Sequence, residues 1–77
     1  MQEKLFLLRK TSGVTQDAIA KMLDINPKTY ASKEMGKTEF SMNEMFKIAS
    51  YFNKHVEDIF LPTILQNGVN NKLEKEE

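Results

Sequence analysis

The connection between two helical patterns near residue 25 is the feature that most limits how this chain can fold. Leu23 ends the apolar pattern of one helix and Pro27 begins the next, so only residues 24–26 separate them. A connector of this length is too short for the two helices to fold back against each other in antiparallel fashion. We therefore predict that they cross at a steep angle, as in a helix-turn-helix arrangement.

Capping and stop residues divide most of the chain into five predicted helices. Thr15, Asn26 and Ser41 are favourable N-caps. Glu44 can complete a capping box with Ser41, while Pro27 suits the first turn of a helix because no amide hydrogen is needed there. No strand pattern is present, so the predicted fold class is all-α. Caps included, the helices are expected over residues 2–12, 15–24, 26–35, 41–53 and 55–60, with stops at Gly13, Gly36, Asn53 and Pro62.

The apolar positions predict which side of each helix faces the interior. Around the short connection, Ile19, Leu23, Ile25 and Tyr30 should converge inside, and the small side chain of Ala20 permits close approach of the third helix. In the fourth helix the interior stripe is expected to contain Met42, Met45, Phe46, Ile48, Ala49 and Phe52. The third helix is then left with an outward stripe of Pro27, Lys28, Ala31 and Ser32.

Charge is separated along the chain although the net charge is zero. Residues 1–37 contain seven basic and four acidic side chains, whereas residues 38–77 contain four lysines and seven acidic side chains. This distribution is compatible with a cationic face at one end of the molecule and an acidic segment at the other. A cationic face would suit a polyanionic partner such as nucleic acid.

Residues with characteristic spacings occur along the chain, and they are Arg9, Gly13, Thr15, Gln16, Ala20, Leu23, Ile25, Asn26, Thr29, Tyr30, Glu34, Gly36, Ile48, Ala49, Asp58, Ile59 and Phe60. This ordered set resembles the Cro/repressor-like helix-turn-helix domain of phage lambda-type repressors and xenobiotic-response-element type regulators. The resemblance covers about residues 4–60, and TYASKEMGKTEFSMNEMFKIA is similar to small repressors of phages, prophages and mobile elements in Gram-positive bacteria. It implies a five-helix, lambda-repressor-like bundle that binds a double-stranded DNA operator, usually as a homodimer.

The resemblance also implies roles for individual side chains. Gln16 would hydrogen-bond a phosphate and brace the recognition helix, and Lys28 is the main candidate for donating to guanine in the major groove. Ser32 and Ala31 could reach base edges, whereas Pro27 offers only apolar contact. Asn26, Thr29 and Lys33 are expected at phosphates or at the groove rim, and Lys37 at a phosphate.

Two further positions are predicted to shape the recognition helix. Arg9 and Glu34 match an ion pair of the family that joins the first helix to the end of the third. Asp24 stands where the family commonly has glycine, and we expect it to adopt the left-handed backbone conformation at some cost in stability. Its replacement by glycine should therefore stabilise the protein slightly.

Composition argues against several other classes of protein. With one histidine and no cysteine, the sequence predicts no enzyme, metal site or cofactor, and we expect no small-molecule ligand. The apolar runs are too short for a membrane span, which favours a cytoplasmic protein. Residues 1–60 are expected to form the DNA-binding domain, and residues 61–77 a possible dimerisation segment followed by a disordered acidic end.

An alternative function on the same fold is an antitoxin or adaptor that holds a protein partner. Such a protein should expose apolar side chains, and the same residues could equally form a homodimer interface. The candidates for either role are Phe6, Leu7, Leu61, Ile64 and Leu65.

Overall fold

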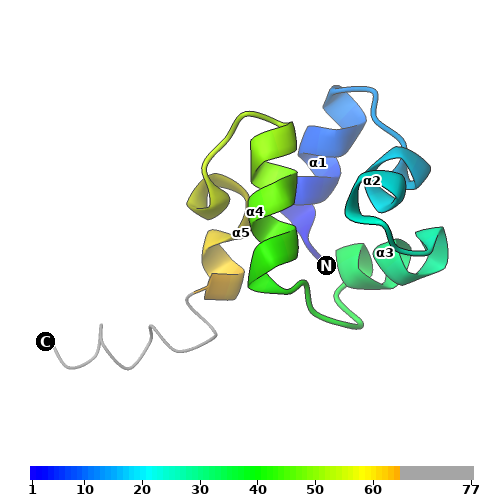
Figure 1. The fold of residues 1–77 in the computed structure, drawn as a ribbon. Coiled ribbons are helices and arrows are strands. Elements are labelled where there is room, and N and C mark those ends of the chain that lie inside the picture. The colour runs from blue at the N-terminus through cyan, green and yellow to red at the C-terminus, as the bar shows by residue number, and fades with distance from the viewer. Residues whose placement is uncertain (65–77) are drawn as a thin grey trace, which may run out of the picture.

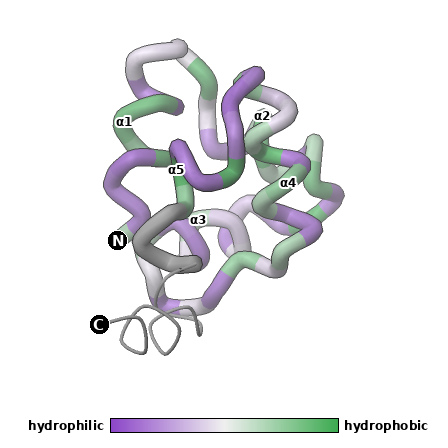
Figure 2. Tube along the Cα trace, turned by 90° about the vertical axis from the view of Figure 1, so that its left-hand side faces the viewer, coloured by the Kyte–Doolittle hydropathy of each residue, from purple (hydrophilic) through white to green (hydrophobic). Residues whose placement is uncertain are grey.

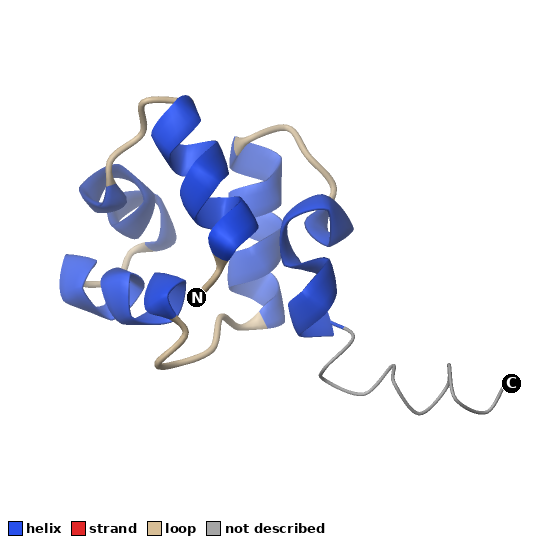
Figure 3. Cartoon of the chain, turned by 180° about the vertical axis from the view of Figure 1, so that it is seen from behind, coloured by secondary structure: helices blue, strands red, loops and turns tan. Residues whose placement is uncertain are grey.

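The computed structural model describes residues 1–64, and the side chains of residues 1–60. The described chain consists of helices joined by loops, without a strand (Figure 3). This confirms the predicted all-α class and the number of helices. The helices are α1 (Glu3–Thr11), α2 (Gln16–Leu23), α3 (Pro27–Met35), α4 (Met42–Tyr51) and α5 (Val56–Ile64).

The helices form two neighbouring groups around one core (Figure 1). Helices α2 and α3 pack against each other, as do α4 and α5, while α1 contacts α5 and α2 contacts α4. In Figure 1, α2 is seen almost along its axis and α3 lies across the view, so the short connector does produce a steep crossing. The N-terminus lies beside α3, where the Gln2 amide donates to the Glu34 carbonyl at 2.8 Å.

The helix ends follow the capping chemistry of the sequence. The Thr15 hydroxyl accepts from the Ala18 amide, and Ser41 and Glu44 form both hydrogen bonds of the capping box. Asp24 closes α2 with a φ of 61°, which is the left-handed conformation predicted for it. Gly13 and Asn53 adopt positive φ at their predicted stops as well.

The core collects buried side chains from all five helices. Around the corner between α2 and α3, Ile19, Ala20, Leu23 and Tyr30 are buried and Ile25 packs against them, as predicted. Along the chain, hydrophobic residues occur in short blocks between hydrophilic ones (Figure 2). In the described part of the chain, no helix is long and apolar enough to cross a membrane.

The predicted interior stripe of α4 was wrong at two positions. Met45, Ile48 and Ala49 are buried, but Met42 is 49% exposed and Phe46 is 56% exposed. Residues four apart lie one above the other on a helix, so Met42 and Phe46 share a face that lies beside the buried one. The helical period identified an apolar stripe wider than the surface that the bundle covers.

Helix α5 is longer than predicted. Helical structure continues to Ile64 instead of ending before Pro62, and Phe60 interrupts it with non-helical angles of φ −116° and ψ 15°. Pro62 follows this kink closely, in the first turn of the second helical piece, where a missing amide hydrogen costs little. The expected boundary at residue 60 therefore falls inside α5. Leu65 and the expected disordered acidic end lie outside the described residues.

Candidate nucleic-acid interface

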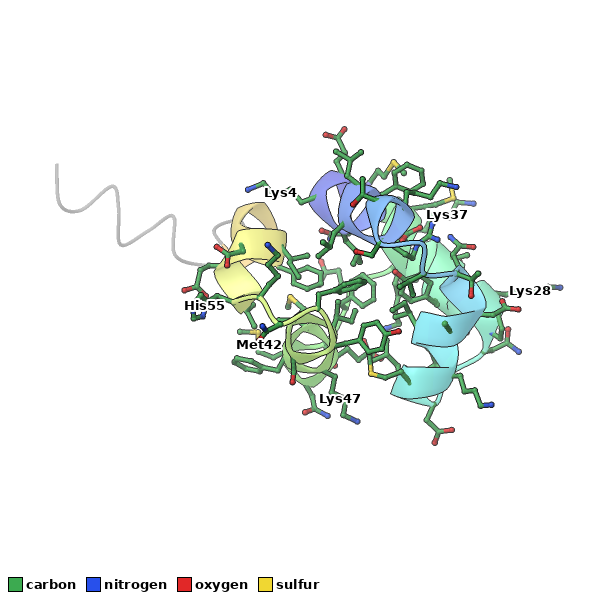
Figure 4. The ribbon with its side chains drawn as sticks, turned by 90° about the horizontal axis from the view of Figure 1, so that it is seen from above. Lys4, Lys28, Lys37, Met42, Lys47 and His55 are labelled. Carbon is green, nitrogen blue, oxygen red and sulfur yellow. The ribbon has the colours of Figure 1, made fainter. Side chains whose placement is uncertain are left out.

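One side of α3 faces solvent along the predicted recognition stripe. Pro27 and Lys28 are exposed, and Ala31 and Ser32 are half-buried. Lys28 projects from the edge of the molecule in Figure 4. Asn26 caps the start of this helix, because its Oδ1 accepts from the Lys28 amide at 2.8 Å. The stripe thus presents one long cation above short side chains.

The opposite side of α3 carries a buried carboxylate that joins three helices. Glu34 is 1% exposed. Its Oε2 accepts from Arg9 Nε at 2.8 Å and from the Tyr30 hydroxyl at 2.8 Å. Its Oε1 accepts from Arg9 Nη2 at 3.2 Å and from Gln16 Nε2 at 2.9 Å. Arg9 and Glu34 therefore form the predicted ion pair, and we call these four side chains the Glu34 cluster.

The hydrogen bonds of the Glu34 cluster determine its ionisation. Burial alone would raise the pKa of the Glu34 carboxyl, but the donors from Arg9, Gln16 and Tyr30 outweigh it and lower that pKa. Burial, followed by the hydrogen bond to Glu34, raises the pKa of the Tyr30 hydroxyl. At neutral pH the cluster therefore holds a carboxylate, a guanidinium and a neutral phenol. No buried side-chain nitrogen or oxygen in the described residues lacks a partner.

Gln16 connects this cluster to the start of α2. It is the first residue of that helix, directly after the Thr15 cap, and its side chain is half-buried. The bond from its Nε2 to Glu34 ties the N-terminus of α2 to the last turn of α3. Gln16 also lines a groove with Arg9, Lys10 and Thr15. The bracing part of the predicted role of Gln16 is thus visible in the structure.

Lys33 does not extend into solvent as a phosphate-contacting lysine would. Only 16% of its side chain is exposed. Its Nζ lies 3.1 Å from Glu44 Oε1 and donates to the Glu39 carbonyl at 3.0 Å. The same Nζ lies 5.9 Å from the centre of the Phe40 ring, within the range of a cation–π contact. The structure places Lys33 against α4 and the preceding loop.

The loop between α3 and α4 carries the remaining predicted cation. Gly36 leaves α3 with a φ of 88°, and Lys37 follows it with an exposed side chain. The Lys37 amide donates to the Ser32 carbonyl at 2.9 Å, which fixes the start of the loop on α3. In Figure 4, Lys37 and Lys28 lie on the same half of the molecule, away from Met42 and His55. Thr29 is exposed on the first turn of α3.

Sequence reasoning missed two polar contacts of α3. The Tyr30–Glu34 hydrogen bond joins residues four apart on one helix, a spacing that could have been recognised. The Lys33–Glu44 pair joins residues on different helices across the α3–α4 loop. No local pattern identifies such a pair, because it depends on where the loop places the first turn of α4 relative to the end of α3.

Comparison with known proteins agrees with this geometry. Residues 5–59 match the helix-turn-helix family HTH_3. An uncharacterized helix-turn-helix-type transcriptional regulator from Methanocaldococcus jannaschii is 38% identical to this chain over 61 residues. The alignment covers 79% of this chain and 92% of that protein. Two from Archaeoglobus fulgidus are each 33% identical over 61 residues, covering 79% of this chain and 87% and 86% of their own lengths. No solved structure matches the chain significantly.

The family and the relatives point to a DNA-binding transcriptional regulator and not to an enzyme. The three relatives are archaeal, whereas the sequence resemblance suggested a Gram-positive phage protein. The match extends from α1 into the first turn of α5 and includes the outer stripe of α3 and the Glu34 cluster. The chain therefore belongs to the Cro/C1-type helix-turn-helix family.

Proposed function

We propose that this protein is a sequence-specific transcriptional repressor that reads operator DNA with the outer face of α3. The observation that carries this proposal is the division of α3 into a side held by the Glu34 cluster and a side left open to solvent. A groove-reading helix needs both, because base contacts require a rigid support and a free surface.

Each residue of the outer stripe of α3 has a role that suits its chemistry. Lys28 donates to guanine O6 and N7 from the first turn of α3. Ser32, one turn later, hydrogen-bonds a base or an ordered water, and Ala31 contacts a thymine methyl group. Pro27 has no side-chain donor, so it offers only apolar contact, and the base pair beside it is read by shape or not at all.

Phosphate contacts flank this stripe and set its position on the duplex. The part of the Gln16 side-chain amide that does not bond Glu34 faces one phosphate, together with the backbone amides at the start of α2. Lys37 reaches another from the α3–α4 loop. Asn26 and Thr29 contact the groove rim. Lys33 is left out of this set because its ammonium group already binds Glu44 and the Glu39 carbonyl.

The proposed working form is a homodimer on an approximately palindromic site. Half-sites then lie about one helical turn, or 34–36 Å, apart. The exposed face of Met42 and Phe46 supports this arrangement, because Met42 and Lys28 lie on opposite halves of the molecule in Figure 4. Leu7 is a second exposed apolar residue, on α1. We expect Phe46→Ser to shift the protein towards monomer in sedimentation analysis, whereas such a shift in Leu7→Ser instead would place the interface on α1.

A phage, prophage or mobile-element origin is the narrower form of the proposal. It is supported by the resemblance of residues 29–49 to small phage repressors, whereas the relatives found by comparison are archaeal. The same proposal includes a cytoplasmic location. It also divides the chain into a DNA-binding domain over residues 1–60 and a dimerisation segment over residues 61–77. Sequencing of the neighbouring genes would test the origin directly.

Titration against DNA tests the proposed function. Fragments of the flanking genomic DNA are compared with a random duplex at about 50 mM and 200 mM salt. We expect one fragment to bind at least about a thousandfold more tightly than the random duplex. A steep salt dependence without sequence preference would contradict the operator, and no binding to any duplex would favour the adaptor or antitoxin function.

A further inference from the structure

Lys33 joins three parts of the structure through one ammonium group. It extends from the last turn of α3, bonds the Glu39 carbonyl in the loop, and pairs with Glu44 in the first turn of α4. Its Nζ also lies over the Phe40 ring. These contacts place the end of the loop at a defined distance from the helix that is proposed to read DNA.

The partner of Lys33 has a second structural task. Glu44 Oε1 accepts from Lys33 Nζ at 3.1 Å and from the Ser41 amide at 2.9 Å, so one oxygen serves the ion pair and the capping box. Burial alone would raise the pKa of Glu44, but the bonds from Ser41 and Lys33 lower it. Glu44 therefore stays ionised and holds Lys33 at neutral pH.

The loop held in this way contains Lys37. Its first residues are attached to α3, because the amides of Lys37 and Thr38 both approach the Ser32 carbonyl, at 2.9 and 3.5 Å. Its last residues are attached through Lys33 and the capping box. With both ends fixed, the loop has little freedom to move Lys37 relative to α3.

We propose that Lys33 is a positioning residue, which holds the α3–α4 loop so that Lys37 meets the DNA backbone, and that it does not contact DNA itself. This inference rests on the proposed DNA-binding function. It gives Lys33 a role opposite to the one that its charge and its place on α3 suggest.

A double-mutant cycle separates positioning from direct contact. Lys33→Met keeps the apolar stem and removes the charge, while Lys37→Ala removes the proposed phosphate contact. We expect Lys37→Ala alone to lower the slope of log affinity against log salt by about 0.9. The double variant should show the same slope as Lys37→Ala. A slope lowered by about 1.8 in the double variant would overturn the inference, because two independent contacts would then have been lost.

Glu44→Gln provides a second background for the same cycle. Glutamine preserves the capping box but lacks the negative charge that pairs with Lys33. We expect Lys37→Ala to cost less affinity in the Lys33→Met and Glu44→Gln backgrounds than in the wild type. Lys47→Met is the matched control, since Lys47 is an exposed lysine of α4 whose described surroundings include no ion pair. An equal cost of Lys37→Ala in all backgrounds would contradict the proposal.

Hydrogen exchange of the free protein tests the loop without DNA. Amides of residues 37–41 should exchange about three- to fivefold faster in Lys33→Met and Glu44→Gln, and at the wild-type rate in Lys47→Met. Unchanged exchange in the first two variants would overturn the role of Lys33. If exchange changes as expected but no duplex binds, the loop-holding contact stands and the proposed DNA-binding function fails.

Discussion

The two sides of α3 differ in almost every physical respect. On the inner side, Tyr30 and Glu34 are buried and hydrogen-bonded to each other and to α1 and α2. On the outer side, Pro27 and Lys28 are exposed, and the Lys28 side chain has no bond to another described residue. The comparison shows that one helix of nine residues divides its two tasks between opposite sides. The residues that set its orientation lie on the inner side, and those available to contact a partner lie on the outer side.

Among the substitutions that test this division, Glu34→Ala should have the largest effect. Removing the carboxylate leaves the Arg9 guanidinium and the Tyr30 hydroxyl without their partner in the interior, which should cost about 3–5 kcal/mol of unfolding free energy. That is a large part of the stability of a small domain. Urea unfolding followed by circular dichroism measures the loss. A loss below about 1 kcal/mol would show that the inner side does not anchor α3.

Lys28→Ala tests the outer side of α3 and should weaken DNA binding while leaving the free energy of unfolding almost unchanged. We expect a loss of about 1–3 kcal/mol in binding to the preferred operator, with relaxed preference at one base pair. Unfolding free energy should stay within about 0.5 kcal/mol of the wild type, as for other surface substitutions. Equal effects on specific and random DNA in the titration would remove Lys28 from the base-reading role.

The pH dependence of stability sharpens the comparison, because the titrating groups with shifted pKa lie away from the outer side. The pKa values of Glu34 and Glu44 are lowered from 4.5 in the folded protein. The unfolded chain therefore binds more protons as pH falls, so stability is complete above about pH 5 and decreases below it. Urea midpoints between pH 7 and pH 3 should follow this course. The decrease should be shallower in Glu44→Gln, and an unchanged profile there would exclude a contribution from Glu44.

The smallest expected effect is at the corner that precedes α3. Asp24 has a φ of 61°, which is unfavourable for a residue with a side chain, so glycine relieves this strain. Glycine also loses more backbone entropy on folding, which offsets part of the gain. We expect Asp24→Gly to stabilise the protein by less than about 1 kcal/mol, or at most about 4–8 °C in Tm. Calorimetry measures this shift. Clear destabilisation would mean that the Asp24 side chain contributes to the corner.

The sequence predicted most of the fold because its information is local. Caps at Thr15, Asn26 and Ser41 and the stops at Gly13 and Gly36 act within one turn of the helices they delimit. Local patterns failed where packing decided the outcome. Phe46 has the correct helical spacing for a core residue, but the bundle covers only the neighbouring face of α4.

The candidate site divides in the same way. Exposure of Lys28 follows from the helical period, which places it opposite the buried residues. The Arg9–Glu34 pair could be predicted only through the family resemblance, since 25 residues separate the two side chains. The Lys33–Glu44 ion pair could not be predicted at all, because it forms only when the α3–α4 loop brings the first turn of α4 close to the end of α3.

Amide NMR of the protein titrated with its preferred DNA fragment tests the central claim most directly. With the Asn26-capped start of α3 docked in the major groove, the largest shift changes should occur at Lys28, Ala31 and Ser32, and smaller ones at Gln16 and Lys37. Amides of Met42 and Phe46 should change little at DNA concentrations that saturate a preformed dimer. Changes concentrated on α4 and α5, with the amides of α3 unaffected, would contradict the account.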